Sequence, residues 1–181
     1  MKVLDTGIDA VKIIEPKVFG DARGFFLETW STEKFAAGGL TPSFVQDNHS
    51  RSGRGILRGL HYQLKHTQGK LVRVLHGEVY DVAVDMRRSS PTFGKHVGVL
   101  LSDENKRMLW VPPGFAHGFV VLSEQVDFLY KCTDIYAPQH ERCLLWNDPA
   151  LGIDWHLNGI EPLLSAKDQV GLPLSQCEVF E

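Results

Sequence analysis

The stretch KLVRVLHGEVYDVAVDM, residues 70–86, decides the fold class of this chain. Two runs rich in β-branched residues flank His76-Gly77, and this pattern predicts two strands joined as a hairpin. In the second run the side chains from Val79 to Met86 alternate, and Asp81 and Asp85 fall on one face. A period of two predicts that polar and apolar side chains occupy opposite faces of the strand.

The same pattern continues along the middle of the chain, in HVGVLLS (96–102), RMLWVP (107–112), HGFVVLS (117–123) and QVDFLYKCTDIY (125–136). Turn-forming residues separate these stretches. Short helices are favoured only at 31–39, beginning at Ser31 or Thr32, and at 165–171, where Ser165 precedes Asp168 by three residues. Short strands at short spacing predict an all-β sandwich or barrel.

Length and composition are those of an ordinary globular protein. The 181 residues fit one domain, so we expect a single domain over residues 1–181. Hydrophobic residues make up 43% and charged residues 23%, and the net charge is -3. This balance argues against nucleic acid or an anionic membrane surface as a partner, although a local basic cluster can still bind an anion.

The three cysteines, Cys132, Cys143 and Cys177, form no CxxC pair. An odd number without such a pair predicts free thiols in a reducing cytosol and no disulfide framework. The N-terminus lacks the apolar segment of a secretory signal, and no run of about 18 apolar residues predicts a membrane span. We therefore expect a cytoplasmic protein.

A cluster of polar residues interrupts the β-rich pattern at RGLHYQLKHTQGKLVRV, residues 58–74. His61 lies three residues after Arg58, and Lys70 begins the strand that follows. A histidine near a strand is commonly a structural or surface residue. Charged neighbours favour a functional role, because a buried charge is costly unless it is used or paired.

Two further stretches carry candidate residues. In VPPGFAHGF (111–119) a Pro-Gly turn delivers His117 to the start of an apolar strand, either as an edge residue or at the mouth of a pocket. Tyr130 is by itself more typical of a packed core residue than of a catalytic one. Tyr136 shares its sheet face if the strand continues unbroken over both residues.

The stretch DARGFFLETW (21–30) allows two interpretations. It is either an edge strand with a salt bridge between Arg23 and Glu28, or a segment that aims an arginine at a phosphate or carboxylate beside an aromatic ring. In VQDNHS (45–50) the amides of Gln46 and Asn48 lie on one strand face.

Both histidine stretches resemble the paired motifs of the cupin superfamily. Gly55 precedes His61 by the spacing of the first motif, and Pro112, Gly114 and His117 match the second. Metal-binding cupins have a second histidine where this chain has Gln63, and a glutamate near Thr67 or Gln68. Neutral amides are poor ligands for zinc or iron, so a metal site is not expected.

The resemblance is closer to one family. DARGFFLETW, QDNHSRSGRGILRGLHYQ, GKLVRVLHGEVYDVAVDMR, SPTFGKHVGVLLS, PPGFAHGF, YKCTDIYAP and NDPALGIDW run in order through roughly residues 1–170. Together they resemble the dTDP-4-dehydrorhamnose 3,5-epimerases of dTDP-rhamnose biosynthesis. The resemblance implies a jelly-roll (cupin) β-barrel, a homodimer, no cofactor and no metal.

The implied reaction is epimerisation of dTDP-4-dehydro-6-deoxy-D-glucose at C3 and C5. By the resemblance, His61 is the base and Asp168 orients it. Tyr130 is the acid, and Lys70 stabilises the enolate. A histidine with a pKa near about 6.5 suits proton removal at neutral pH.

The resemblance also implies a set of substrate-binding residues. Arg23 and Arg58, with Lys167, are expected on the pyrophosphate, and His117 beside the sugar or phosphate. Hydrogen bonds to the nucleotide or sugar are expected from Glu28, Gln46, Asn48 and Glu141. Tyr136 and Phe26 are candidates to stack on thymine.

Three alternatives remain open from the sequence. A related epimerase can invert C3 alone or C5 alone with the same base and acid. A non-catalytic barrel that binds nucleotide-sugars needs Arg23 and Arg58 but neither His61 nor Tyr130. A metal-dependent cupin is disfavoured by Gln63.

Overall fold

Two antiparallel sheets form the body of the protein in the computed structural model, which describes residues 1–181. The six-stranded sheet has the order β1 (Lys2–Asp5), β2 (Lys12–Glu15), β10 (Met108–Val111), β7 (Lys70–His76), β12 (Gln125–Cys132) and β5 (Gln46–Gly53). The five-stranded sheet has the order β13 (Glu141–Cys143), β6 (Leu57–Gln63), β11 (Phe115–Val121), β8 (Glu78–Asp85) and β9 (His96–Ser102). The predicted all-β, jelly-roll-like fold is confirmed, although the sheets do not join into a closed barrel.

The hydrophobic core lies between the two sheets. Its largest cluster contains 16 buried residues, with Val72 and Phe128 from the six-stranded sheet and Val79 and Phe119 from the other. The rings of Phe119 and Phe128 stack with centroids 4.1 Å apart. This contact joins the sheets directly, and the side chains that follow along both strands border a cavity.

Helices are short and lie outside the sheets. They are α1 (Thr32–Ala37), α2 (Ala166–Gln169) and two 3₁₀ turns, η1 (Pro138–His140) and η2 (Leu174–Gln176). The expected first residues are confirmed, because Ser31 caps α1 and Ser165 caps α2. No helix has both the length and the apolar character needed to cross a membrane.

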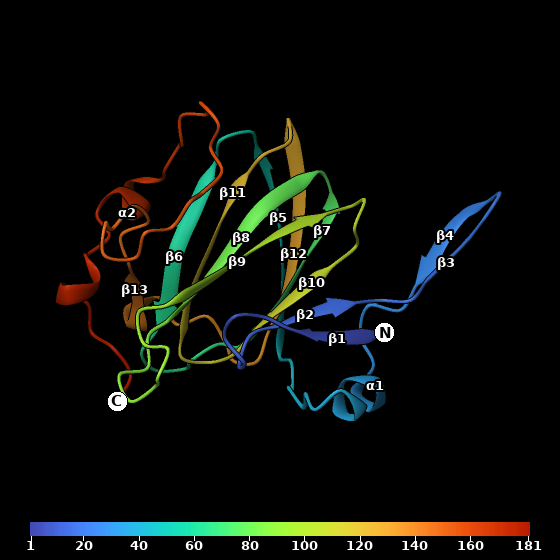
Figure 1. The fold of residues 1–181 in the computed structure, drawn as a ribbon, viewed down its shortest axis with the longest axis horizontal. Helices are drawn as coiled ribbons and strands as arrows, with labels where there is room; N and C mark the ends of the chain where they lie inside the picture. The colour runs from blue at the N-terminus through green and yellow to red at the C-terminus, as the bar shows by residue number, and fades with distance from the viewer.

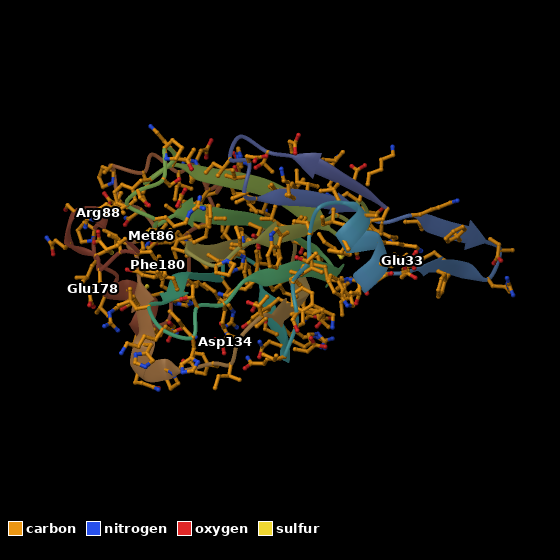
Figure 2. The ribbon with its side chains drawn as sticks, turned by 90° about the horizontal axis from the view of Figure 1, so that it is seen from below. Glu33, Met86, Arg88, Asp134, Glu178 and Phe180 are labelled. Atoms are coloured by element: carbon orange, nitrogen blue, oxygen red, sulfur yellow. The ribbon has the colours of Figure 1, made fainter.

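The C-terminal segment covers the outer face of the five-stranded sheet. Figure 2 shows Phe180 beside Met86, at the end of the molecule opposite the hairpin of β3 (Val18–Asp21) and β4 (Gly24–Leu27). The amide of Phe180 donates a 3.0 Å hydrogen bond to the carbonyl of Met86. Leu144 and Trp155 belong to the buried cluster beneath this segment. Both faces of the sheet are therefore covered.

The prediction that residues 70–86 form a hairpin is wrong. Strand β7 pairs with β10 and β12, whereas β8 pairs with β11 and β9 in the other sheet. Gly77 alone connects them, with φ +82°, and one residue is too short to close a hairpin, whose tightest common loops have two. The chain instead crosses from one sheet to the other.

The alternation along β8 is confirmed, but its polar face does not meet water. Asp81 and Asp85 are both fully buried. Asp81 faces the interior between the sheets, where it contacts His117. Val82 and Val84 lie in the cluster under the C-terminal segment. The alternating pattern correctly predicted which face of the strand each side chain occupies. It could not show that other parts of the chain cover both faces.

A two-stranded hairpin, β3 (Val18–Asp21) with β4 (Gly24–Leu27), projects from the body of the molecule (Figure 1). It exposes Phe19, Phe25 and Phe26, whose exposed fractions are 52%, 61% and 68%. Large exposed apolar patches on soluble proteins commonly mark interaction sites.

The link at Gly77 should be sensitive to a single methyl group. A Cβ at this position would lie 2.1 Å from the carbonyl oxygen of Gln125, whereas Gly152, also at positive φ, has open space around it. Gly152→Ala should cost about 1–2 kcal/mol for the left-handed backbone. Gly77→Ala should cost about 1–3 kcal/mol more because of the clash. Chemical denaturation of both variants measures the difference, and equal losses would contradict the steric explanation.

Candidate active site

One pocket of about 400 Å³ between the sheets gathers most of the predicted site residues. Strands of both sheets and the C-terminal helix α2 contribute to its walls. The predicted residues that line it are Gln46, Asn48, Arg58, His61, Lys70, His117, Tyr130, Tyr136, Glu141, Lys167 and Asp168. Residues far apart in the sequence therefore converge on one cavity.

His61 and Asp168 form a close pair at one wall of the pocket. Nε2 of His61, on β6, lies 2.5 Å from Oδ1 of Asp168 on α2. The hydroxyl of Ser165 donates to the other carboxylate oxygen at 2.7 Å, and the amide of Gly59 reaches Oδ1 at 3.4 Å. Burial by itself raises the pKa of Asp168, but the hydrogen bonds from His61 and Ser165 outweigh it, so the pKa lies below its ordinary value.

This geometry fixes the tautomer of His61. An ionised carboxylate only accepts hydrogen bonds, so Nε2 carries the proton and donates it to Asp168. Nδ1 then keeps a free lone pair in the neutral ring. The arrangement is that of a general base with an orienting carboxylate.

Lys70 lies at the first position of β7, next to β12 in the sheet, where it pairs with Cys132. Its Nζ is 5.9 Å from the centroid of the Tyr130 ring. Burial lowers the pKa of Lys70, because the ammonium is partly removed from water. A cation in such surroundings interacts strongly with a negative charge that forms beside it.

Tyr130 lies on the neighbouring strand β12. Burial raises the pKa of its phenol, and the nearby Cys132 adds to the effect. Its hydroxyl therefore stays protonated over the neutral range and can serve as a proton donor. This direction is opposite to the lowered pKa that would make a tyrosine a faster acid.

A second carboxylate–imidazole pair lies next to the first. His117 on β11 stands opposite His61 on β6 in the sheet register. Nε2 of His117 is 2.9 Å and 3.0 Å from the two oxygens of Asp81, which is fully buried. Asp81 thereby holds the ring in one orientation and leaves its Nδ1 free for a ligand.

The polar residues around the pocket support one another through hydrogen bonds. Ser52 accepts two hydrogen bonds from the guanidinium of Arg58, at 2.9 and 3.1 Å, which fixes the arginine. Lys167 and the hydroxyl of Tyr136 both bond to Glu141, at 2.9 and 3.1 Å. These contacts hold two cationic side chains near one cavity, as binding of a phosphate group requires.

Three predicted residues lie elsewhere. Arg23 and Phe26 are on or beside the projecting β3–β4 hairpin, where Arg23 forms an ion pair with Asp21. Glu28 pairs with Lys34 at 2.8 Å. Arg23 and Glu28 thus both form salt bridges, although not with each other, and none of the three lines the pocket.

Strand β12 ends at Cys132, so Tyr130 and Tyr136 are not on one continuous strand. Tyr136 reaches the pocket from the loop, where its amide bonds to Gln46 at 2.9 Å. The expectation that both tyrosines share a sheet face is therefore not fulfilled, although both line the pocket.

Several residues of the site were not identified from the sequence. Ser50, Gln68 and Ser165 line the pocket. Asp81 holds His117 through a hydrogen bond to Nε2 of its ring. Asp81 left one detectable sign, an acidic residue at an alternating position of an apolar strand. Ser165 was identified only as a helix cap.

Gln63 has a structural role. Its amide nitrogen donates to the carbonyls of His66 and Ile135 at 2.6 and 3.1 Å, and its oxygen accepts from the amide of Ala137 at 2.9 Å. The side chain is thus fully used in holding two loops. It does not offer a ligand at the position where metal-binding cupins have a histidine.

The chain is similar in sequence and in fold to known proteins. The family model of dTDP-4-dehydrorhamnose 3,5-epimerase matches residues 5–176. An enzyme of that name from Pseudomonas aeruginosa is 60% identical over 181 residues, which cover 99% of each chain. The crystal structure of dTDP-6-deoxy-D-glucose-3,5-epimerase from Legionella pneumophila, in complex with dTDP-4-keto-L-rhamnose, is 56% identical, with a TM-score of 0.95 over 98% of this chain and 94% of that one.

A more distant structure has a related activity. A 3'-monoepimerase from Streptomyces bikiniensis, in complex with dTDP-quinovose, is 34% identical, with a TM-score of 0.89 over 95% of this chain and 87% of that one. The fold is therefore shared by enzymes that differ in the carbons they invert. Because the family model matches nearly the whole length of this chain and a relative is 60% identical, the chain belongs to the dTDP-4-dehydrorhamnose 3,5-epimerase family of isomerases.

Proposed function

We propose that this protein epimerises dTDP-4-dehydro-6-deoxy-D-glucose at C3 and C5 to give dTDP-4-dehydro-L-rhamnose, without a cofactor. The observation that carries the proposal is the His61–Asp168 pair, which lines one pocket with Lys70 and Tyr130. The names of the P. aeruginosa and L. pneumophila relatives support the substrate and the product.

The chemistry follows from the ketone at C4 of the substrate, which acidifies the protons on C3 and C5. Nδ1 of His61 removes each proton, while Asp168 stabilises the imidazolium that forms. Lys70 stabilises the enolate oxygen as a cation already in position. Tyr130 donates a proton to the opposite face of the sugar ring, which inverts the carbon. After each epimerisation the imidazolium of His61 releases its extra proton to solvent and the phenolate of Tyr130 takes one up.

The rest of the pocket suits a nucleotide diphosphate. Arg58 and Lys167 supply the positive charge for the pyrophosphate, and Ser52 keeps Arg58 in place. Gln46 and Asn48, joined by a 3.2 Å hydrogen bond, offer amide groups for hydrogen bonds to the nucleotide or sugar. Tyr136 offers an exposed ring for the base.

Exchange of substrate protons for deuterium tests the reaction. In D₂O, chelator-treated protein should exchange the protons on C3 and C5 of the substrate for deuterium and invert both carbons. NMR of the sugar protons follows this exchange. His61→Asn should reduce turnover by roughly 10²–10⁴-fold, because the base is lost. Its affinity for dTDP should remain, and the exposed-histidine control His76→Asn should keep full turnover.

The outcome also separates the competing functions. Deuterium at one carbon alone would indicate a single-carbon epimerase, an activity found in the S. bikiniensis relative. No incorporation would favour a nucleotide-sugar-binding protein, or a metal-dependent enzyme if added metal restored exchange. Near-native turnover of His61→Asn would refute the assignment of the base.

The pH dependence should identify Lys70 as the group that limits activity in alkaline solution. Burial lowers its pKa from the ordinary 10.5, while Cys132, Glu141 and Asp81 oppose the shift in part. The ammonium is needed to stabilise the enolate, so kcat/KM should fall as pH rises through a value below 10.5. The phenol of Tyr130 titrates above its ordinary 10.0. The residual kcat/KM of Tyr130→Phe should therefore fall over the same alkaline pH range as that of wild type. If this fall were absent in Tyr130→Phe, the titrating group would be Tyr130 and not Lys70.

We further propose that the protein acts as a homodimer in which the β3–β4 hairpin of each chain enters the pocket of the other. Three exposed phenylalanines on this hairpin support the proposal, because burial of their rings would favour association. Arg23 and Phe26 would then reach a nucleotide in the second chain. Their distance from their own pocket would be a consequence of the assembly.

Mixed dimers distinguish exchange of hairpins from action within one chain. The double variant Arg23→Ala with Phe26→Ala and the variant His61→Asn should each be nearly inactive. When the two are unfolded together and refolded, activity should return, because the mixed dimer has one site with both an intact base and an intact hairpin. No recovery, with mixed dimers present by mass measurement, would show that each hairpin serves its own chain or none.

The proposed location is the cytoplasm. All three cysteines are free thiols, and Cys132 is buried. Free thiols persist in a reducing compartment.

A further inference from the structure

A thiol lies beside the proposed catalytic pair. Cys143 on β13 stands opposite His61 on β6 in the sheet register. One ligand atom each of His61, Cys143 and Asp168 lies within 4.8 Å of the other two. Imidazole, thiolate and carboxylate are the three side-chain groups that bind Zn²⁺ in proteins.

The three atoms surround a common point. Because no pair is more than 4.8 Å apart, one position lies within about 2.8 Å of all three. Zn²⁺ bonds to these groups are about 2.0–2.3 Å long and tetrahedral, so Nε2 of His61 and Oδ1 of Asp168, now 2.5 Å apart, must separate by roughly 0.8 Å to admit the ion. A water molecule or a substrate oxygen would supply the fourth ligand, since only three protein groups are present.

The local charge favours a cation. Asp168 is 2% exposed and ionised, whereas the charge of Glu141, on the same strand as Cys143, is balanced by Lys167 at 2.9 Å. The negative charge of Asp168 attracts a divalent cation, and a bound cation stabilises the thiolate of Cys143.

Cys143 is reached from a different side than the substrate. It lines a second cavity of about 400 Å³, whose wall also includes Cys177, Lys167 and Glu141. Cys143 does not line the substrate pocket. His61 and Asp168 line the substrate pocket instead, so an ion bound to all three residues would lie between the two cavities.

We infer that His61, Cys143 and Asp168 form an inhibitory site for Zn²⁺ and similar thiophilic divalent cations. The metal bonds to Nε2 of His61, to Oδ1 of Asp168 and to Sγ of Cys143. The thiol proton leaves to solvent, and the proton of Nε2 moves to Nδ1 of the neutral ring. Nδ1 then has no lone pair to accept a proton from the substrate, so turnover stops.

This site is different from the metal site of cupins. By the resemblance, that site uses positions 61, 63 and 117 and a glutamate near position 67 or 68, and Gln63 is bound to backbone groups. The inhibitory site takes its ligands from β6, β13 and α2. The loss of activity rests on the proposed role of His61, whereas binding of the metal does not.

Two cysteine variants test the site, because Cys143 and Cys177 line the same cavity. Chelator-treated wild type, Cys143→Ser and Cys177→Ser are titrated with Zn²⁺ at buffered free concentrations while deuterium exchange into the substrate is followed. Wild type and Cys177→Ser should lose turnover with one bound ion per chain. Cys143→Ser should keep its metal-free turnover and need roughly 10–100-fold more Zn²⁺ for the same loss, since one ligand is missing.

Cobalt absorption gives a readout that is independent of catalysis. Co²⁺ should produce a thiolate-to-cobalt band in wild type and Cys177→Ser, and none in Cys143→Ser. Absence of this band in wild type, or equal Zn²⁺ inhibition of all three proteins, would overturn the site. A band with unchanged turnover would overturn the inhibition. A band in a protein that never turns over the substrate would leave the site standing and refute the proposed function.

Discussion

The hydrogen bond between His61 and Asp168 is the interaction on which the site depends. It joins the five-stranded sheet to α2, a helix of four residues that would not be stable alone. Ser165 contributes twice, because its hydroxyl accepts from the amide of Asp168 and donates to the carboxylate. The hydroxyl that caps the helix thus also orients the carboxylate that holds the imidazole.

The two imidazoles gain different surroundings from the same sheet register. His61 is held from the edge of the sandwich by a carboxylate on a helix, whereas His117 is held from inside by Asp81 on a neighbouring strand. In a cupin framework the corresponding positions can share one metal ion. Here each ring has its own carboxylate, and Gln63 ties two loops together, so the same framework is suited to proton transfer.

Sequence alone predicted the strands and the fold class well, because a period of two is a local property. It failed at Gly77, where one residue decides whether the chain returns in the same sheet or crosses to the other. The family resemblance found Asp168, which spacing could not link to His61. The resemblance also named Arg23, Phe26 and Glu28 as binding residues. Nothing in the sequence indicated that these residues would lie outside the pocket formed by the rest of the chain. Asp81 was missed because its importance comes from a partner on another strand.

The place of Asp168 in the chain has a consequence for folding. His61 and Asp168 are 107 residues apart in sequence, and α2 takes no part in the strand pairing of either sheet. Closing so long a loop has an entropic cost that sheet contacts meet first. A molecule with both sheets assembled and α2 undocked would have a substrate cavity and a histidine with no fixed tautomer. We therefore expect the proposed catalytic competence to arise late in folding, and the return of activity on refolding to report the docking of α2 and not the assembly of the sheets.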